Sequence, residues 1–202
     1  MTTLPWICVM DILGAYYRAL NRFTHGYVRL RYNNEFSLGN NVVFYGRPLL
    51  RILPGAKISV GDNVNFISAP SANLVGLTKP MSMVVLQGAT LNIGGDTGFS
   101  GVSIVCHESI TIGQYCNIGG NVWIWDTDFH SLDWQIRRKT SAGPSTKPIV
   151  IGNDVFVGAN TIILKGVEIG DRSIVGAGSV VSKNIPADEL WAGNPARFVR
   201  KI

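Results

Sequence analysis

The sequence predicts a β-solenoid, in which short strands wind in successive coils, and three observations support this fold class. Only 15% of the 202 residues are charged, against roughly a quarter in an ordinary soluble domain. Glycine occurs 23 times, and isoleucine and valine occur 20 times each. A six-residue repeat also runs through much of the chain. The low charge and the β-branched composition exclude a helical bundle, a coiled coil and a disordered chain.

The repeat is clearest over residues 151–186, which read IGNDVF, VGANTI, ILKGVE, IGDRSI, VGAGSV, VSKNIP. The first position of each unit is Ile or Val, the second is mostly Gly, and the fifth is small or β-branched. Neither a helical period nor simple alternation persists over this stretch. We expect the aliphatic residues to fill the interior of the coils and the glycines to supply unusual backbone angles at the corners.

The same pattern returns upstream as IGQYCN, IGGNVW, IWDTDF from Ile112, and fainter copies begin at Ile93, Val60 and Leu38. The repeats therefore extend over about residues 38–186, with loops near 68–83 and 126–148. The second loop carries no repeat signal, and loops of that length are usually functional or disordered.

Residues 1–35 carry no repeat and are expected to form an N-terminal extension, with the solenoid domain occupying 36–202. Residues 11–30 mix apolar and basic side chains in the manner of an amphipathic helix. Such a helix either caps the open end of the solenoid or lies on an anionic membrane through Arg18, Arg22 and Arg29. No apolar run is long enough to span a bilayer. With three scattered cysteines and no signal-peptide pattern, we expect a cytoplasmic protein, with the inner face of the membrane as the alternative.

The tandem repeats and the ending SVVSKNIPADELWAGNPARFVRKI resemble the hexapeptide-repeat acyltransferases, and among them the sugar and polysaccharide O-acetyltransferases. The resemblance covers about residues 38–202. It implies an all-β, left-handed parallel β-helix with three hexapeptides per coil. It also implies a homotrimer with acetyl-CoA bound between subunits. The implied activity is acetyl transfer to a sugar hydroxyl of a cell-surface polysaccharide or its precursor, in polysaccharide biosynthesis.

His130 lies where the repeat stops and the long loop begins, a position matching the family's catalytic histidine. An imidazole is suited to take the hydroxyl proton as the oxygen attacks the thioester. We therefore expect His130 to be the general base; the alternative is a solvated loop histidine. Asp126 and Asp128 either orient the imidazole or cap the turn. No metal is expected, because His107 and His130 are too few for the three-histidine zinc site of related carbonic anhydrases.

The formal charge of +5 favours an anionic ligand, and the resemblance implies the residues that bind the coenzyme. It implies phosphate contacts from Lys183, Arg197 and Arg200, and adenine and pantetheine contacts from Ala177, Ser182 and Pro195. It implies that the backbone N–H of Ala159 stabilises the oxyanion. A solvated basic tail is the alternative for the cations. Phe156 departs from the family, which commonly has Trp there, and so an indole N–H donor is lost.

Trp123, Trp125 and Trp134 lie near His130 in the sequence, and their flat rings suit either sugar faces or subunit contacts. The resemblance also implies that Ser100 contacts the acceptor. Cys116 occupies the small-residue position of its repeat and is expected in the core rather than as a nucleophile.

Other functions stay open on the sequence alone. They are acetylation of an antibiotic or an amino-sugar nitrogen, and a non-catalytic glycan-binding solenoid. Nucleic acid is not an expected partner, because the basic run at 137–139 is too short.

Overall fold

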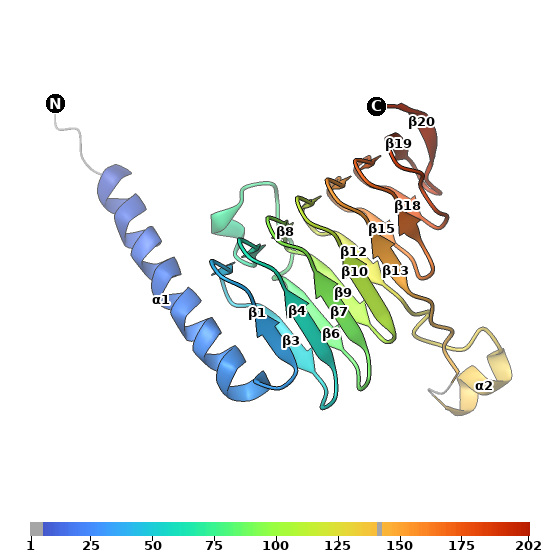
Figure 1. Ribbon diagram of the computed structural model, residues 1–202, viewed down its shortest axis with the longest axis horizontal. Helices are drawn as coiled ribbons and strands as arrows, with labels where there is room; N and C mark the ends of the chain where they lie inside the picture. Colours follow the sequence, from blue (N-terminus) through green and yellow to red (C-terminus); the bar gives the residue numbers. More distant parts are fainter. Residues whose placement is uncertain (1–5, 141–142) are drawn as a thin grey trace.

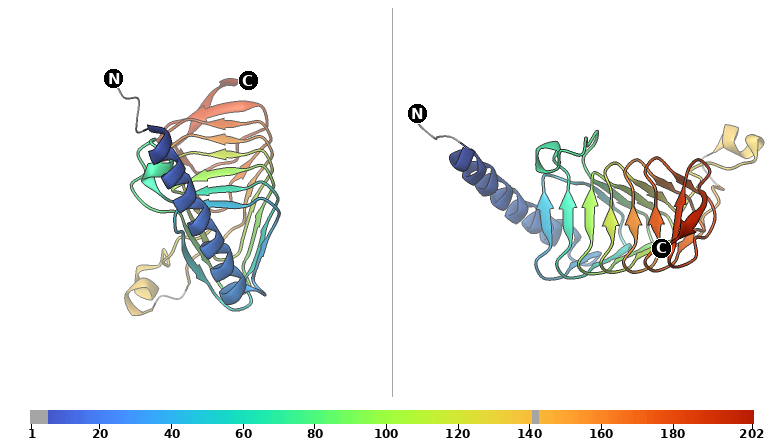
Figure 2. Two further views of the ribbon diagram at one scale, coloured as in Figure 1. Left: turned by 90° about the vertical axis from the view of Figure 1, so that its left-hand side faces the viewer. Right: turned by 90° about the horizontal axis from the view of Figure 1, so that it is seen from above.

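The computed structural model describes residues 6–140 and 143–202 and is a left-handed parallel β-helix preceded by a long helix (Figure 1). Strands follow one another around three sides of a column, and each strand pairs in parallel with the strand one coil later (Figure 2). We call the three sides sheet A (β1-β4-β7-β10-β13-β16), sheet B (β2-β5-β8-β11-β14-β17-β19-β20) and sheet C (β3-β6-β9-β12-β15-β18). This confirms the predicted fold.

Six coils contribute one strand to each sheet. The first three coils are β1 (Phe36–Leu38), β2 (Val43–Tyr45), β3 (Leu49–Ile52); β4 (Lys57–Val60), β5 (Asn65–Ile67), β6 (Ser82–Val85); and β7 (Thr90–Ile93), β8 (Gly98–Ser100), β9 (Ser103–Cys106). The next three are β10 (Ser109–Ile112), β11 (Asn117–Ile118), β12 (Trp123–Trp125); β13 (Ile149–Ile151), β14 (Phe156–Val157), β15 (Ile162–Ile163); and β16 (Glu168–Ile169), β17 (Ile174–Val175), β18 (Val180–Val181). β19 (Glu189–Ala192) and β20 (Arg197–Lys201) then form an antiparallel pair.

The core is a stack of inward-facing aliphatic and aromatic side chains. The first positions of the six clearest repeats are all buried, as predicted: Ile151, Val157, Ile163, Ile169, Val175 and Val181. In the early coils the rings of Phe44, Phe66 and Phe99 stack in succession at 5.0 and 5.2 Å. Burial of this continuous column stabilises coils that could not fold singly.

The glycines at the second repeat position serve a different purpose from the one predicted. Gly152 and Gly170 do not have a positive φ. Instead, a Cβ on Gly152 would lie 2.3 Å from Asp171 Oδ1, and one on Gly170 would lie 2.4 Å from the backbone N of Ala187. Close approach of the next coil therefore requires glycine. The left-handed backbone angles fall mainly on polar residues after them, such as Asp154 at φ 57°, which tolerate this region better than most.

The predicted N-terminal helix is present as α1 (Trp6–Tyr32). Its later half covers the first coil, where Val28 and Tyr32 are buried. Asn21 Oδ1 accepts from the backbone N–H of Phe44 at 2.8 Å, and the His25 ring pairs with the carbonyl of Val42 at 2.8 Å. Of the helices described, none is long and apolar enough to cross a membrane.

Two excursions interrupt the coils. Residues 68–81 contain η1 (Pro70–Ala72), and residues 126–148 contain α2 (Trp134–Lys139), which projects away from the column (Figure 1). Asp133 caps α2 by accepting from the N–H of Gln135 at 2.8 Å. This short helix was not predicted, because six residues give too little periodicity to detect.

Candidate functional site

Predicted site residues from the third, fifth and sixth coils lie along the edge where sheet B turns into sheet C. Ser100 ends β8, Ala159 follows β14, and Ala177 follows β17. The N–H of Gly178 donates to the carbonyl of Ala159 at 2.8 Å, which joins the last two coils at this edge. Within the described part of the chain, the N–H groups of Ala159 and Ala177 donate to no acceptor. Both donors are therefore available to a ligand.

The predicted phosphate-binding cations lie at the C-terminal end of the column. Arg197 and Arg200 are exposed on β20, which extends sheet B through β19, and exposed Lys183 follows β18. Ser182 and Pro195 lie at the same end and are also exposed. Over residues 6–140 and 143–202, no carboxylate pairs with any of the three cations. Unpaired, exposed guanidinium and ammonium groups fit a phosphate-bearing ligand.

His130 is exposed at the start of the long loop, beyond the end of β12. Its backbone N–H donates to the carbonyl of Asp128 at 2.7 Å. The preceding residue, Phe129, has a left-handed φ of 62°. Its ring packs edge-on against Trp125 at 5.3 Å and His107 at 6.2 Å. These ring contacts anchor the loop where His130 leaves the column.

The two predicted aspartates make different contacts. Asp126 is fully buried, and its carboxylate accepts the backbone N–H groups of His107, Glu108 and Ser109 at 2.7, 2.8 and 2.9 Å. The carboxylate of Asp128 lies 3.5 Å from Lys165 Nζ. No hydrogen bond joins either carboxylate to the His130 imidazole among the residues that the structure describes. Asp126 thus has the contacts of a turn cap.

The tryptophans do not share one surface with Ser100. Trp123 and Trp125 lie on the outer face of sheet C, with ring centroids 6.3 Å apart. Trp134 lies on α2, where the Arg138 guanidinium stacks 4.5 Å from its ring centre. Because sheet C lies between the Ser100 edge and the start of the His130 loop, a single chain keeps these two predicted elements apart.

Lys79 is a neighbour of this region that sequence reasoning missed. Its ammonium lies 5.1 Å from the Trp123 ring centre and donates to the carbonyl of Gly101. Burial lowers the pKa of Lys79 to about 8. No sequence signal could reveal this, because the 68–81 loop folds back over the edge only in three dimensions.

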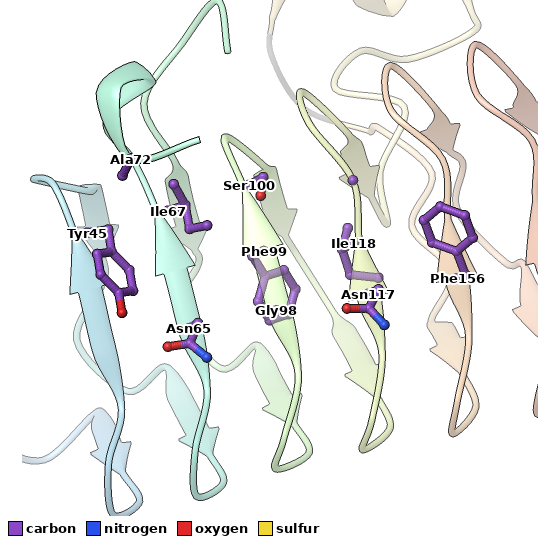
Figure 3. A pocket seen from close by; sticks show the side chains of 11 residues that line it. Tyr45, Asn65, Ile67, Ala72, Gly98, Phe99, Ser100, Asn117, Ile118 and Phe156 are labelled. Atoms are coloured by element: carbon purple, nitrogen blue, oxygen red, sulfur yellow. The ribbon is translucent and has the colours of Figure 1, made fainter. Parts of the chain in front are cut away.

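A groove of about 620 Å³ runs along the outer face of sheet B (Figure 3). It crosses β2, β5, β8, β11 and β14, and Ala72 of η1 forms part of its wall. Ser100 lines it, whereas the three tryptophans do not. Sequence reasoning missed Tyr45, Asn65 and Asn117, although the two asparagines open strands of different coils in corresponding places.

The cysteines inside the solenoid belong to the core. Cys106 and Cys116 are buried, and burial raises the pKa of both thiols; the nearby Asp126 charge adds to the effect on the pKa of Cys106. A thiol that stays protonated is a poor nucleophile. Among the residues described, no group of three or more His, Cys, Asp or Glu side chains is placed to hold a metal ion.

Comparisons with known proteins agree with this architecture. Residues 148–183 match the family model "Bacterial transferase hexapeptide (six repeats)". The chain is 39% identical over 101 residues to galactoside O-acetyltransferase of Escherichia coli (strain K12). The matched region covers 50% of this chain and 48% of that protein. The chain thus spans about half the length of this curated relative.

Two solved structures cover more of the chain. A hexapeptide-repeat acetyltransferase of Vibrio cholerae O1 biovar eltor in complex with acetyl-CoA has a TM-score of 0.55 and 27% identity, covering 91% of this chain and 87% of that one. The polySia specific acetyltransferase NeuO has a TM-score of 0.54 and 25% identity, with coverages of 86% and 83%. The repeat, the fold and these similarities relate the chain to the hexapeptide-repeat acetyltransferases.

Proposed function

We propose that the protein transfers the acetyl group of acetyl-CoA to a hydroxyl of a sugar in a cell-surface polysaccharide or its precursor. The observation that carries the proposal is the edge between sheets B and C. This edge carries Ser100 and the N–H of Ala159, which has no acceptor among the described residues, and cations without a carboxylate partner lie at the C-terminal end of the column. The named activity of the galactoside O-acetyltransferase and of NeuO supports the choice of a sugar acceptor.

Acetyl-CoA is the second substrate in this proposal. Lys183, Arg197 and Arg200 bind its phosphates through charge-assisted hydrogen bonds. Ala177, Ser182 and Pro195 contact its adenine and pantetheine parts. The residues fit such a ligand, because the cations lack carboxylate partners in the described chain and all six residues are exposed.

In the proposed reaction, His130 takes the proton of the acceptor hydroxyl while the oxygen attacks the thioester carbon. The backbone N–H of Ala159 stabilises the negative oxygen of the tetrahedral intermediate. When the C–S bond breaks, His130 returns the proton to the departing thiolate. The products are an acetyl ester and CoA, and an imidazole suffices as base without a metal ion.

The separation of His130 from the Ala159 edge favours an active site between copies of the chain. We propose a homotrimer in which His130 of one copy meets the edge of its neighbour. The outer face of sheet C suits this contact, because it presents Val84, Val105, Ile162 and Val180. Such an apolar face is expected to be covered in the assembly. Mass photometry should therefore give three chains per particle, and V105E should dissociate them.

Helix α1 supports two roles for the N-terminal extension. Its contacts with the first coil support a cap. Its other side leaves Tyr16, Phe23 and Leu30 exposed and carries several arginines, which supports contact with an anionic membrane surface. Co-sedimentation with vesicles rich in anionic lipid tests the second role, and equal recovery with neutral vesicles would contradict it.

CoA release, measured with a thiol reagent and a panel of glycan acceptors, tests the enzymatic proposal. His130→Ala should lower kcat by roughly 10²–10⁴-fold, whereas Leu132→Ala, on the same exposed loop, should not. Arg200→Ala should raise the KM for acetyl-CoA more than Lys201→Ala does. A His130→Ala variant with the full rate would refute the base assignment.

Further results would favour the alternative functions. A product resistant to hydroxylamine would indicate N-acetylation. No CoA release and no thermal shift with CoA would favour a non-catalytic glycan-binding solenoid.

A further inference from the structure

We propose that the groove on sheet B binds an uncharged oligosaccharide chain that lies along the axis of the column. The groove, defined above by its five strands and η1, would then hold several sugar units at once. The inference rests on the proposed function in one respect, because it takes the bound chain to be the acetyl acceptor. It deepens that function by favouring a glycan of several units over a single sugar.

The length of the groove is the first argument. The groove crosses five neighbouring strands (Figure 3). Asn65, Gly98, Asn117 and Phe156 are in register on four of them, and Tyr45 lies on the fifth, two residues out of that register. Neighbouring strands lie about 4.8 Å apart, so that the four intervals span about 19 Å. One sugar ring would fill only part of this length and of the 620 Å³ volume.

The chemistry of the lining is the second argument. Aromatic rings stand at the two ends, Tyr45 at one and the half-exposed Phe156 at the other, and such rings stack on the apolar faces of sugars. Between them, the side-chain amides of Asn65 and Asn117 make no hydrogen bond within residues 6–140 and 143–202. An amide both donates and accepts, as a sugar hydroxyl does.

The charge of the groove decides between ligand classes. None of the eleven described residues that line it carries a charge. A phosphate or carboxylate ligand would therefore find no countercharge there. The predicted coenzyme cations Arg197 and Arg200 lie farther along the same sheet, on β20. The two substrates would thus occupy different stretches of sheet B, with Phe156 at the coenzyme side of the groove.

The wall of the groove is held in place by contacts from other elements. The Tyr17 hydroxyl of α1 hydrogen-bonds with Ser71 Oγ at 2.6 Å, and the Tyr17 ring packs edge-on against Tyr45 at 5.9 Å. Asn73 Nδ2 donates to Ser100 Oγ at 2.9 Å. The N-terminal helix and the 68–81 loop therefore pre-shape the groove, which lowers the entropic cost of binding a flexible chain.

Gly98 offers a precise way to block the groove. A Cβ built at this residue meets nothing closer than Asn117 Oδ1 at 3.9 Å, and its φ is not positive. Gly98→Leu should therefore fold normally and fill the floor of the groove. Asn92→Leu is the matched control, because Asn92 is an exposed, outward-facing residue of β7 in the same coil but on sheet A.

The test measures binding without acetyl transfer. The full-length protein, labelled at isoleucine methyl groups, is titrated with neutral oligosaccharides of increasing length from glucose, galactose, mannose and N-acetylglucosamine series. We expect shifts at Ile67 and Ile118, both of which line the groove. For at least one series, affinity should rise at least about tenfold from one sugar to four. Gly98→Leu should abolish that gain, whereas Asn92→Leu should keep it.

Three results would overturn the proposal: no binding in any series, equal affinity for one sugar and four, or wild-type binding by Gly98→Leu. His130→Ala separates this inference from the proposed function, because it should bind the chain normally and fail to acetylate it. If the wild type binds longer chains more tightly but acetylates none of them, the proposed function is refuted and the binding proposal is retained. If acetylation does not depend on chain length and is unaffected by Gly98→Leu, the binding proposal is refuted and the proposed function is retained.

Discussion

Asp126→Asn is the change that best tests how the loop carrying His130 is held. The buried carboxylate accepts three backbone N–H groups, one at Oδ1 and two at Oδ2. An Asn side chain keeps one acceptor oxygen and places its NH₂ group against the remaining N–H donor. The substitution therefore removes one charge-assisted bond, leaves a buried donor unpaired and weakens the other two bonds.

Hydrogen bonds to charged groups contribute about 1.5–3 kcal/mol each, so that the free energy of unfolding should fall by about 3 kcal/mol. Chemical denaturation monitored by tryptophan fluorescence measures this change. Asp128→Asn is the matched control, because its carboxylate makes a partly exposed ion pair with Lys165, and such pairs contribute about 0–1 kcal/mol. A loss below about 0.5 kcal/mol for Asp126→Asn would refute the reasoning.

A double-mutant cycle distinguishes capping from orientation of the imidazole. If Asp126 acts as a cap, Asp126→Asn should lower the free energy of unfolding by the same amount whether residue 130 is His or Ala. The effects of Asp126→Asn and His130→Ala on the activation free energy should then be additive, with a coupling near zero. A coupling above about 1 kcal/mol in kcat/KM would instead show that Asp126 acts through His130.

Other features give independent tests. Gly170→Ala should lower the free energy of unfolding by about 1–3 kcal/mol, because its Cβ would lie 2.4 Å from the backbone N of Ala187. Gly98→Ala is the control and should be tolerated. Equal losses of stability in the two variants would contradict the claim that close approach of the next coil requires glycine at residue 170. Burial of Lys79 favours its neutral amine, so that stability should rise between pH 8 and the unfolded value of 10.5. Amine acetylation followed by mass spectrometry should have its midpoint near pH 8 at Lys79 in the folded protein, and a midpoint near 10.5 would refute the pKa shift. Cys116 should resist thiol reagents until unfolding, because burial raises its pKa, and Cys116→Ala should keep the rate of acetyl transfer; a large loss of rate would reopen the nucleophile hypothesis.

The repeat determined the fold because its information is local. One aliphatic residue in every six gives a side chain that each coil must bury, and residues such as Ile151 and Val175 lie in the core as predicted. Breaks in the same pattern located both loops, and the mix of apolar and basic residues at 11–30 indicated the N-terminal helix. The β19–β20 pair was not predicted, because periodicity ends with the last repeat and antiparallel pairing depends on contacts outside it.

The candidate site also combines residues that the sequence could propose with contacts that only the structure could show. Resemblance was enough to propose His130, Ala159 and the C-terminal cations, because each lies in a recognisable motif. It left open whether Asp126 caps or orients, a question that depends on the backbone donors of a different coil. The repeat by itself explained the second-position glycines by backbone angles, whereas the structure shows that the neighbouring coil approaches these glycines too closely for a Cβ.

The sequence by itself determined a coiled column, its loops and the residues for an acetyl-transfer proposal. Only the tertiary structure decided which side chains share a surface. Tyr45, Asn65, Asn117 and Phe156 are unevenly spaced along the chain, because loops of different lengths separate their coils. Strand pairing puts Asn65, Asn117 and Phe156 in register on sheet B regardless of that spacing, with Tyr45 on the next strand. The physical reason is that register is fixed by backbone hydrogen bonds between coils, whereas the intervening loops can vary freely in length.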